Sequence, residues 1–347
     1  MPDPSSGIFR TLRVPASSAN LGPGFDTLGL ALDLYLQCRF RRAPELTIRV
    51  SGRDSAQIPT GEDNLIWQIA RQIMSLYGPH KEHGSHKGLG SGGQDAIELI
   101  IDNDIPLGKG LGSSAAAVMA GVIIGAELAG LEWDHTRVLD EAARIEGHPD
   151  NAAACALGGI VASAMVTSAP ATSPTDSPMR QLGAISAFSS AAGCANACAV
   201  RLEFPARFGV AVIVPGFQVP TSEARRVLPE SYSREDAIFN LQRAALLVAA
   251  LATGASAAFP AALEDRLHQP HRFALVPGLQ EVTRLRARGL LGCALSGAGP
   301  SILVFYERGH EEVCELARRV FSANGRSREN HSEILWTKVA AHGYQLT

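Results

Sequence analysis

The chain of 347 residues has no surplus of basic charge, because its 31 Lys and Arg are outnumbered by 34 Asp and Glu and the formal net charge is −3. It contains no Lys/Arg-rich run of the kind that follows a nucleic-acid backbone, so nucleic acid is not expected as a partner. Long hydrophobic runs are also lacking, since the longest apolar segment, Ala244–Ala252, is too short to span a bilayer. The amino-terminal residues show no signal-peptide pattern. We therefore expect a cytoplasmic protein without a membrane partner.

Paired cysteines are lacking as well. No two cysteines form a CxxC pair, and no histidine accompanies them at zinc spacing, which argues for buried reduced thiols. The six are Cys38, Cys155, Cys194, Cys198, Cys293 and Cys314. With 46% hydrophobic and 19% charged residues, the chain can bury a sizeable core, and its length favours two lobes over one small domain.

Hydrophobic periodicity predicts a mixture of strands and helices. Alternation predicts strands near 8–14, 46–50 and 97–101, and apolar segments predict further strands at 158–162, 208–214, 291–295, 302–306 and 333–337. Helical spacing with a polar cap before it predicts helices after Asn64 and Asp134, and others at 113–129, from about 222, 234 and 259, and at 310–321. Low complexity marks two insertions, 84–94 and 167–197.

The strongest chemical signal is the glycine-rich segment between the 97–101 strand and the following helix. Its members are Pro106, Leu107, Gly108, Lys109, Gly110, Leu111, Gly112, Ser113, Ser114, Ala115 and Ala116. Three alternate glycines let the main chain turn and point N–H groups inward, and the helix adds partial positive charge at its start. The segment fits neither the P-loop nor the dinucleotide-binding pattern. A tight strand–helix connection is the alternative, but the glycines, serines and small-residue helix together favour a phosphate site.

A second dense loop follows the first strand, in the run Val14–Gly29. Asn20 can donate and accept hydrogen bonds, and Asp26 offers a carboxylate suited to an ammonium group. Taken alone, the loop would be explained by Asn20 closing a turn and Asp26 capping the next segment.

The order and spacing of four motifs resemble the GHMP kinases over about the whole chain outside the two insertions. These motifs are SSANLGPGFDTLG, the glycine–serine segment, EGHPDN followed by LGG, and SGAGPS. The first and third are nearest to the members of the family that phosphorylate homoserine, whereas the NLIGEH run of galactokinase-like members is absent. The resemblance implies an α+β fold with two lobes, an N-terminal one like ribosomal protein S5 domain 2 and a C-terminal ferredoxin-like one. The division expected is 1–165, an insertion at 166–198, and 199–347.

The resemblance also implies roles for particular residues. The family pattern places the amino acid L-homoserine against five residues, with the aspartate facing its ammonium group and two arginines holding its carboxylate: Asn20, Asp26, His148, Arg225 and Arg272. A guanidinium pairs bidentately with a carboxylate in a way that lysine cannot. Gly297 of the SGAGPS turn is expected to line the acceptor side and to steady the phosphate loop, although the turn also reads as a simple hairpin.

For the nucleotide, the family pattern implies that Asn64 lies near the adenine of ATP and that Ser114 binds Mg²⁺. The other metal ligand of the family matches Asp140 by its spacing from the HPDN motif, with Glu141 beside it as the alternative. Asp150 is a candidate base by residue type, but a structural role in its turn is favoured, with proton removal left to the phosphate.

The resemblance therefore implies ATP-dependent phosphorylation of homoserine on the way to threonine, by a homodimer. Two other interpretations stay open at this point. One is a GHMP kinase for another small alcohol such as mevalonate, and the other is a nucleotide-dependent sensor of the same fold without turnover.

Overall fold

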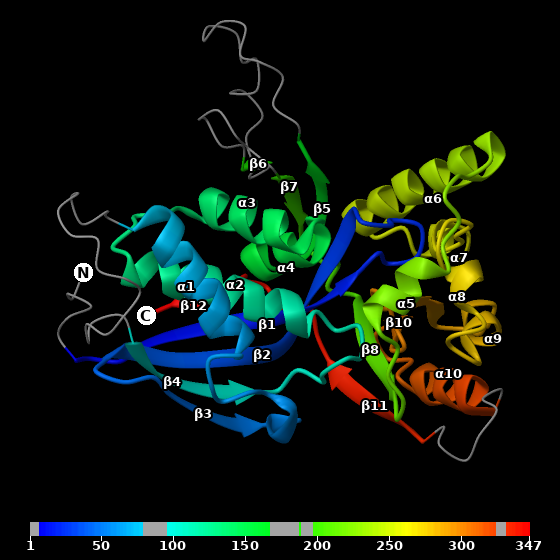
Figure 1. The fold of residues 1–347 in the computed structure, drawn as a ribbon. Coiled ribbons are helices and arrows are strands. Elements are labelled where there is room, and N and C mark those ends of the chain that lie inside the picture. The colour runs from blue at the N-terminus through cyan, green and yellow to red at the C-terminus, as the bar shows by residue number, and fades with distance from the viewer. Residues whose placement is uncertain (1–6, 79–95, 167–186, 189–196, 324–330) are drawn as a thin grey trace, which may run out of the picture.

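The computed structural model describes residues 7–78, 96–166, 187–188, 197–323 and 331–347. Two lobes, each built on its own β-sheet, lie side by side (Figure 1). This confirms the expected two-lobed α+β fold. Both predicted insertions fall mainly outside the described residues, and the predicted division at 165/166 and 198/199 stays a prediction.

The N-terminal sheet has eight strands. Its main path runs in the order β12-β1-β2-β5-β7-β6, while β4 pairs with both β2 and β3. The strands are β1 (Arg10–Ala19), β2 (Leu28–Ala43), β3 (Thr47–Gly52), β4 (Ala96–Asn103), β5 (Ile160–Met165), β6 (Ala187–Phe188), β7 (Ala197–Leu202) and β12 (Gln345–Leu346). The end of the chain thus returns to the first sheet. The sequence did not predict β2, because its first positions, Leu28–Leu32, are all buried and show no alternation.

Four helices cover one face of this sheet (Figure 1): α1 (Leu65–Tyr77), α2 (Ser113–Leu128), α3 (His135–Glu146) and α4 (Asp150–Leu157). Asp134 accepts a hydrogen bond from the Arg137 amide and caps α3, as its position predicted. Helix α2 is buried nearly all round, and its glycines let α1 approach closely. A Cβ at Gly121 would lie 2.6 Å from the Cβ of Ile69. Helix α3 ends at Glu146, where Gly147 adopts a left-handed conformation. The sequence did not predict α4, because the turn around Pro149 is typical of a helix end, yet Pro149 directly precedes the first residue of α4.

The C-terminal sheet has four antiparallel strands in the order β11-β8-β10-β9. They are β8 (Phe208–Pro215), β9 (Leu290–Leu295), β10 (Ile302–Glu307) and β11 (Ser332–Thr337). The helices are α5 (Thr221–Arg226), α6 (Arg234–Thr253), α7 (Phe259–Ala262), α8 (Gln269–Arg272), α9 (Leu279–Thr283) and α10 (Glu312–Ala323), with short 3₁₀ turns at Ser55–Gln57 and Ser256–Ala258. Strand, helices, two strands, helix and strand in this order form the ferredoxin-like split βαβ arrangement.

Helix α6 departs from one expectation. By length and composition alone it could cross a membrane, and only 22% of that window is buried in the protein. One such helix is weak support for a membrane span. The buried Asn240 in α6 donates to the carbonyl of Pro23 at 2.9 Å and accepts from the Arg266 amide at 2.8 Å, which ties the helix to the lobe.

Candidate active site

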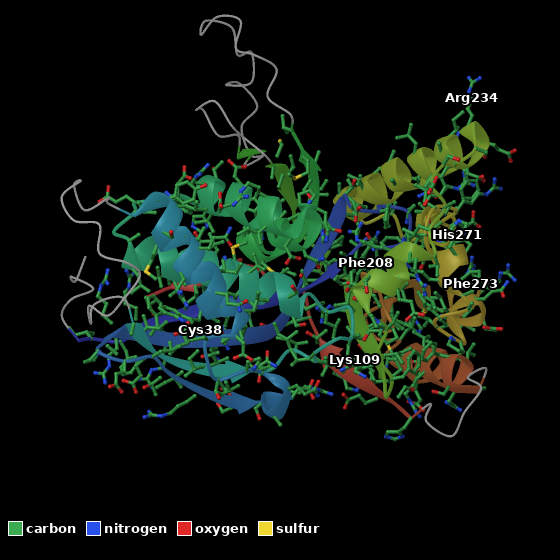
Figure 2. All side chains as sticks on the ribbon, viewed as in Figure 1. Cys38, Lys109, Phe208, Arg234, His271 and Phe273 are labelled. Carbon is green, nitrogen blue, oxygen red and sulfur yellow. The ribbon has the colours of Figure 1, made fainter. Side chains whose placement is uncertain are left out.

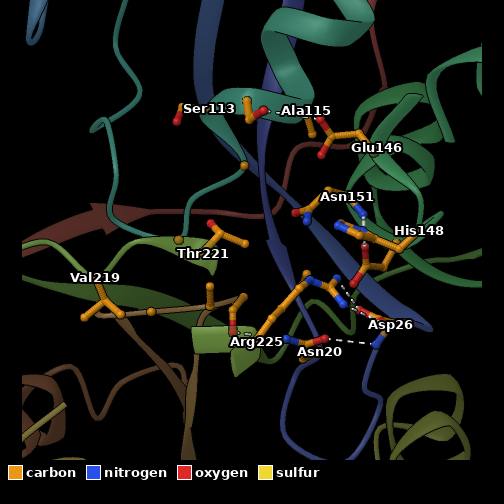
Figure 3. Close-up of a pocket in the computed structure, with 18 of the residues that line it drawn as sticks. Asn20, Asp26, Ser113, Ala115, Glu146, His148, Asn151, Val219, Thr221 and Arg225 are labelled. Atoms are coloured by element: carbon orange, nitrogen blue, oxygen red, sulfur yellow. Dashed lines mark hydrogen bonds and ion pairs between the residues drawn. The ribbon is translucent and has the colours of Figure 1, made fainter. Parts of the chain in front are cut away.

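A pocket of about 290 Å³ lies where the two lobes meet, and residues from both lobes line it. The glycine loop before α2, the loop after β1, the α3–α4 turn, α5 and the turn between β9 and β10 all contribute (Figure 3). Segments far apart in the sequence are therefore brought to one cavity. It contains both loops that the sequence singled out.

The glycine loop takes a backbone path that side chains would block. Gly108, Gly110 and Gly112 have φ angles of 66°, 76° and 68°. A Cβ at Gly110 would lie 2.2 Å from the carbonyl oxygen of Ser296, and one at Gly112 would lie 2.0 Å from the Ser17 hydroxyl. The glycines are needed both for their left-handed conformation and for close packing. The loop leads into α2 with its small residues facing the cavity.

Six of the predicted loop residues line the pocket: Gly108, Gly110, Gly112, Ser113, Ser114 and Ala115. The other five, Pro106, Leu107, Lys109, Leu111 and Ala116, do not. The start of the 16-residue helix α2 therefore opens into the cavity, with its unpaired N–H groups and partial positive charge. This arrangement suits a bound anion.

Lys109 is turned away from the pocket toward the C-terminal strands (Figure 2). Its ammonium group donates to the carbonyls of Pro215 at 2.8 Å and Phe217 at 2.7 Å. Burial lowers the pKa of this lysine. The side chain thus joins the glycine loop to the second lobe.

An acidic side chain that the sequence analysis did not select lies beside Ser114. Glu146, the last residue of α3, lines the pocket, and its Oε1 accepts a hydrogen bond from the Ser114 hydroxyl at 3.3 Å. Burial raises the pKa of this carboxyl group. The glutamate stands in the EGHPDN motif itself, which is the signal that could have found it. Hydroxyl and carboxylate oxygens are the donors that Mg²⁺ prefers.

The predicted ligand Asp140 and its alternative Glu141 lie away from this pocket. Both are buried, neither lines the pocket, and Asp140 accepts from the Ala197 amide at 3.1 Å. Glu141 accepts from the Tyr77 hydroxyl at 3.1 Å and is paired with Arg144. Six residues rotate a helix by about 600°, so residues 140 and 146 face different sides of α3. The structure therefore brings Glu146 to the side of Ser114, and not the two carboxylates that the spacing to the HPDN motif indicated.

The loop after β1 is held by Asn20. Asn20 and Asp26 adopt left-handed conformations, with φ angles of 72° and 52°. The Asn20 amide oxygen accepts from the Asp26 amide at 3.0 Å, and its nitrogen donates to the carbonyl of Gly297 at 3.0 Å. Both polar atoms of Asn20 are therefore used within the protein. The strained loop presents the Asp26 carboxylate to the pocket.

Asp26 forms an ion pair with Arg225 across the pocket, with 3.1 Å between Oδ1 and Nη2 (Figure 3). Near them, the Nδ1 atom of His148 lies 2.7 Å from the carboxylate of the buried Asp150. This hydrogen bond raises the pKa of His148. Asp26, His148 and Asp150 have ligand atoms within 4.8 Å of one another, and among the described residues they are the one group of three histidine, cysteine or acidic side chains close enough to share a cation.

Arg272 is almost fully buried, at 2% exposure, at the edge of the same pocket. Its Nε donates to the carbonyl of Ala224 at 3.0 Å, and Nη1 donates to the carbonyl of Gly297 at 3.1 Å. Burial lowers its pKa to about 10, with the charge of Arg225 as the second cause. The two arginines expected to act together thus lie close enough to influence each other.

Asn64 is not brought to the pocket. Its side chain accepts from the Trp67 amide at 3.3 Å and donates to the carbonyl of Pro59 at 2.7 Å, so it caps α1. The structure therefore does not bring this residue to the glycine loop's cavity. Asn151 and Thr221, which no sequence motif singled out as site residues, also line the pocket. Asn151 accepts from the Ser17 hydroxyl at 2.8 Å.

Comparison with known proteins agrees with this geometry. Residues 64–159 match the model of the GHMP kinases N terminal domain. The chain is 54% identical to a homoserine kinase of Solibacter usitatus (strain Ellin6076) over 347 residues, covering 99% of each chain. It is 40% identical to a homoserine kinase of Deinococcus radiodurans, covering 86% of this chain and 84% of that one.

Solved structures show the same fold at lower identity. A homoserine kinase from Cytophaga hutchinsonii matches with a TM-score of 0.72 at 24% identity, covering 99% of this chain and 98% of that one. The galactokinase of Lactococcus lactis matches with a TM-score of 0.59 at 12% identity, covering 98% of this chain and 95% of that one. At these identities the likeness concerns the fold alone.

Proposed function

Because the chain belongs to the GHMP kinase family, among its homoserine kinases, we propose that it phosphorylates L-homoserine. The reaction transfers the γ-phosphoryl group of ATP to the side-chain hydroxyl and gives O-phospho-L-homoserine, a step of threonine biosynthesis. One observation carries the proposal: an anion-binding loop and the Asp26–Arg225 ion pair line the same pocket. The first suits the phosphates, and the second has one charge for each end of a zwitterionic amino acid.

On the donor side, we assign the phosphates to the backbone of Gly108–Ser114. Phosphoryl transfer needs little covalent chemistry from the protein, so positioning and charge neutralisation do most of the work. The N–H groups at the start of α2 donate to the phosphate oxygens, while Lys109 acts from behind by anchoring the loop. A contact between Asn64 and the adenine is only what the family pattern implies, because the Asn64 side-chain amide is already engaged in capping α1.

For Mg²⁺ we assign Ser114 and Glu146 in place of Ser114 and Asp140. The residues fit the ion because a hydroxyl and a partly desolvated carboxylate meet at the start of α2, facing the loop assigned to the phosphates. When bound, Mg²⁺ would neutralise charge on the β- and γ-phosphates.

On the acceptor side, Asp26 is assigned to the ammonium group and Arg225 with Arg272 to the carboxylate. The amino acid would exchange their mutual contacts for its own, because Asp26 and Arg225 are already paired. Asn20 and Gly297 support these groups: Asn20 orients Asp26, and the carbonyl of Gly297 receives hydrogen bonds from Asn20 and Arg272. His148 faces the same pocket, steadied by Asp150.

No protein base is assigned. Asp150 is buried, and its carboxylate already accepts from His148 and from the Asn151 amide at 2.7 Å. Asp150 lines the pocket, but a carboxylate held by these two hydrogen bonds supports His148, and we assign it no proton from the substrate. We therefore assign the proton of the hydroxyl to the transferred phosphate.

The test is an ADP-release assay with L-homoserine, mevalonate and galactose side by side, each with ATP and Mg²⁺. We expect turnover with L-homoserine alone. Turnover with mevalonate or galactose instead would overturn the assignment of the acceptor. ATP binding without turnover on all three would identify a nucleotide sensor and overturn the enzymatic proposal.

We further propose that the enzyme is a cytoplasmic homodimer. Helix α6 exposes the apolar side chains of Ile238, Leu241 and Leu246 at 43%, 71% and 40%, which is surface that a second copy could cover. Light scattering on the purified protein tests the state. A monomer at micromolar concentration would refute the dimer.

A further inference from the structure

His268 lies outside the pocket lining but contacts the groups that shape the acceptor side. Its ring is fully buried. His268 directly precedes the four-residue helix α8, whose last residue is Arg272. On one side its Nε2 lies 2.7 Å from the carbonyl oxygen of Gly22, in the loop of Asn20 and Asp26. On the other side its Nδ1 lies 3.0 Å from Nη1 of Arg272.

The partners of the ring determine its tautomer. A guanidinium only donates, so Nδ1 must be the acceptor and carry no proton. A carbonyl oxygen only accepts, so Nε2 carries the proton and donates it to Gly22. Both nitrogens are satisfied only by a neutral ring protonated at Nε2. Burial is the main cause that lowers the pKa of His268. The charge of Arg272 also lowers it, whereas the charge of Asp265 opposes the shift.

The ring is fixed on its other faces as well. Phe25, which lines the pocket, stacks on it with 5.3 Å between ring centroids and 24° between planes. Asp265 accepts from the His268 amide at 3.2 Å and from the Gln269 amide at 2.7 Å, which holds the start of α8. One imidazole therefore joins the acceptor loop, the short helix and the buried arginine.

Arg272 needs this support, because a helix of four residues does not fix a long side chain. Its other hydrogen bonds go to main-chain carbonyls, at Ala224 beside Arg225 and at Gly297 beside the glycine loop. Within the described part of the chain, Nδ1 of His268 is the one side-chain atom that accepts a hydrogen bond from Arg272. Losing it would leave the guanidinium held by main-chain carbonyls alone, in a site where a displacement of about 1 Å is costly.

We propose that His268 is a positioning residue for recognition of the amino-acid carboxylate, acting through Nδ1 on Arg272 and through Nε2 on the acceptor loop. The proposal rests on the proposed function, since it assumes that Arg272 meets the carboxylate of homoserine. It predicts that the position needs an acceptor at Nδ1 more than it needs an imidazole.

Two variants of similar size separate the two nitrogens. In H268N the amide oxygen can stand at the position of Nδ1 and accept from Arg272, whereas in H268Q the amide nitrogen can stand at the position of Nε2 and donate only to Gly22. H271Q is the matched control, because His271 lies on the same short helix and contacts Tyr232 instead of Arg272.

We expect H268Q to raise the KM for homoserine about tenfold or more, because a hydrogen bond to a charged group is lost. H268N should stay within about threefold of the unaltered enzyme. Neither variant should change the KM for ATP, and H271Q should change neither constant. An unchanged homoserine KM in H268Q, an equal loss in H268N and H268Q, or a parallel rise in both KM values would overturn the proposal.

A measurement on the unaltered protein covers the case in which the variants fail to fold. With ¹⁵N-labelled histidine, His268 should give the NMR signals of a neutral ring protonated at Nε2 at pH 7. A ring protonated at Nδ1, or at both nitrogens, would overturn the proposal without reference to activity. Failure of the unaltered enzyme to phosphorylate homoserine would instead overturn the proposed function and leave this result to stand.

Discussion

Replacing Arg272 by lysine keeps the positive charge of the site but removes the planar set of N–H donors of the guanidinium. The guanidinium makes three hydrogen bonds within the protein, to Ala224, Gly297 and His268 at 3.0, 3.1 and 3.0 Å. A lysine ammonium is a single point of donation on a flexible stem and cannot form the same fork. We expect R272K to lose at least two of these bonds while a charge remains at a position that is 2% exposed.

The expected magnitude follows from the bonds lost on binding. Nε and Nη1 are engaged within the protein, so Nη2 is left to donate to the carboxylate. A lysine ammonium that is not held in this way loses that charge-assisted bond, a loss of about 1.5–3 kcal/mol. Every 1.4 kcal/mol is tenfold, so the KM for homoserine should rise about 10- to 100-fold. The KM for ATP should change by less than about threefold, since Arg272 makes no hydrogen bond to the glycine loop.

The assay measures ADP release while one substrate is varied at saturating levels of the other. R284K is a suitable control, because Arg284 on the same lobe lies outside the pocket. A thermal melt of each variant separates a loss of fold from a loss of recognition. If R272K raised the KM values for ATP and homoserine equally, the reasoning that assigns Arg272 to the acceptor would be refuted.

Three further predictions concern the metal, the loop and pH. E146Q should raise the Mg²⁺ concentration needed for half-maximal activity at least tenfold. D140N, which keeps an acceptor for the Ala197 amide, should leave that concentration unchanged. If D140N raised it and E146Q did not, the metal would be assigned to Asp140. G112A should lower the free energy of unfolding by more than the ~1–2 kcal/mol cost of a left-handed alanine, and it should raise the KM for ATP. G130A should show the conformational cost alone, because Gly130 has a φ of +69° and nothing lies within 4 Å of its Cβ position. Equal melting temperatures for the two variants would contradict this. The bond to Asp150 raises the pKa of His148 above its ordinary 6.5, so its contribution to stability is fully present below pH 6.5 and is lost as pH rises through the raised pKa. The melting-temperature difference between the unaltered protein and H148N should therefore shrink as pH rises, and a difference that grows would contradict the pairing.

Much of the fold could be predicted from local sequence. Polar caps marked the starts of α1 and α3, and alternation marked β3 and β4, because these signals depend only on neighbouring residues. Strand β2 was missed since its first five residues are all buried, and α4 was missed since Pro149, which indicated a break after α3, also precedes the first residue of α4. In both cases the local pattern is the same for two different structures.

The glycine loop shows how far sequence alone reached into the site. The alternation of Gly108, Gly110 and Gly112 before a small-residue helix was enough to predict a phosphate-binding turn, because only glycine readily adopts φ angles near +70°. Sequence order also predicted that Asp26, Arg225 and Arg272 act together, through a family pattern. The mutual ion pair of Asp26 and Arg225 was not foreseen, since they stand about 200 residues apart.

Tertiary structure alone decided which way each polar side chain points. Lys109 and Asn64 sit in or before motifs of the expected kind, yet their polar atoms are satisfied by Pro215, Phe217 and α1. Of Asp140 and Glu146 on α3, only Glu146 is turned toward Ser114, which is why we propose it for the metal. Backbone conformation follows from residues close in sequence, whereas the direction of a side chain is set by partners that only the packed chain supplies. For this protein, the sequence was enough to predict a phosphate loop and an acceptor loop, and folding decided which of their side chains line the pocket that they share.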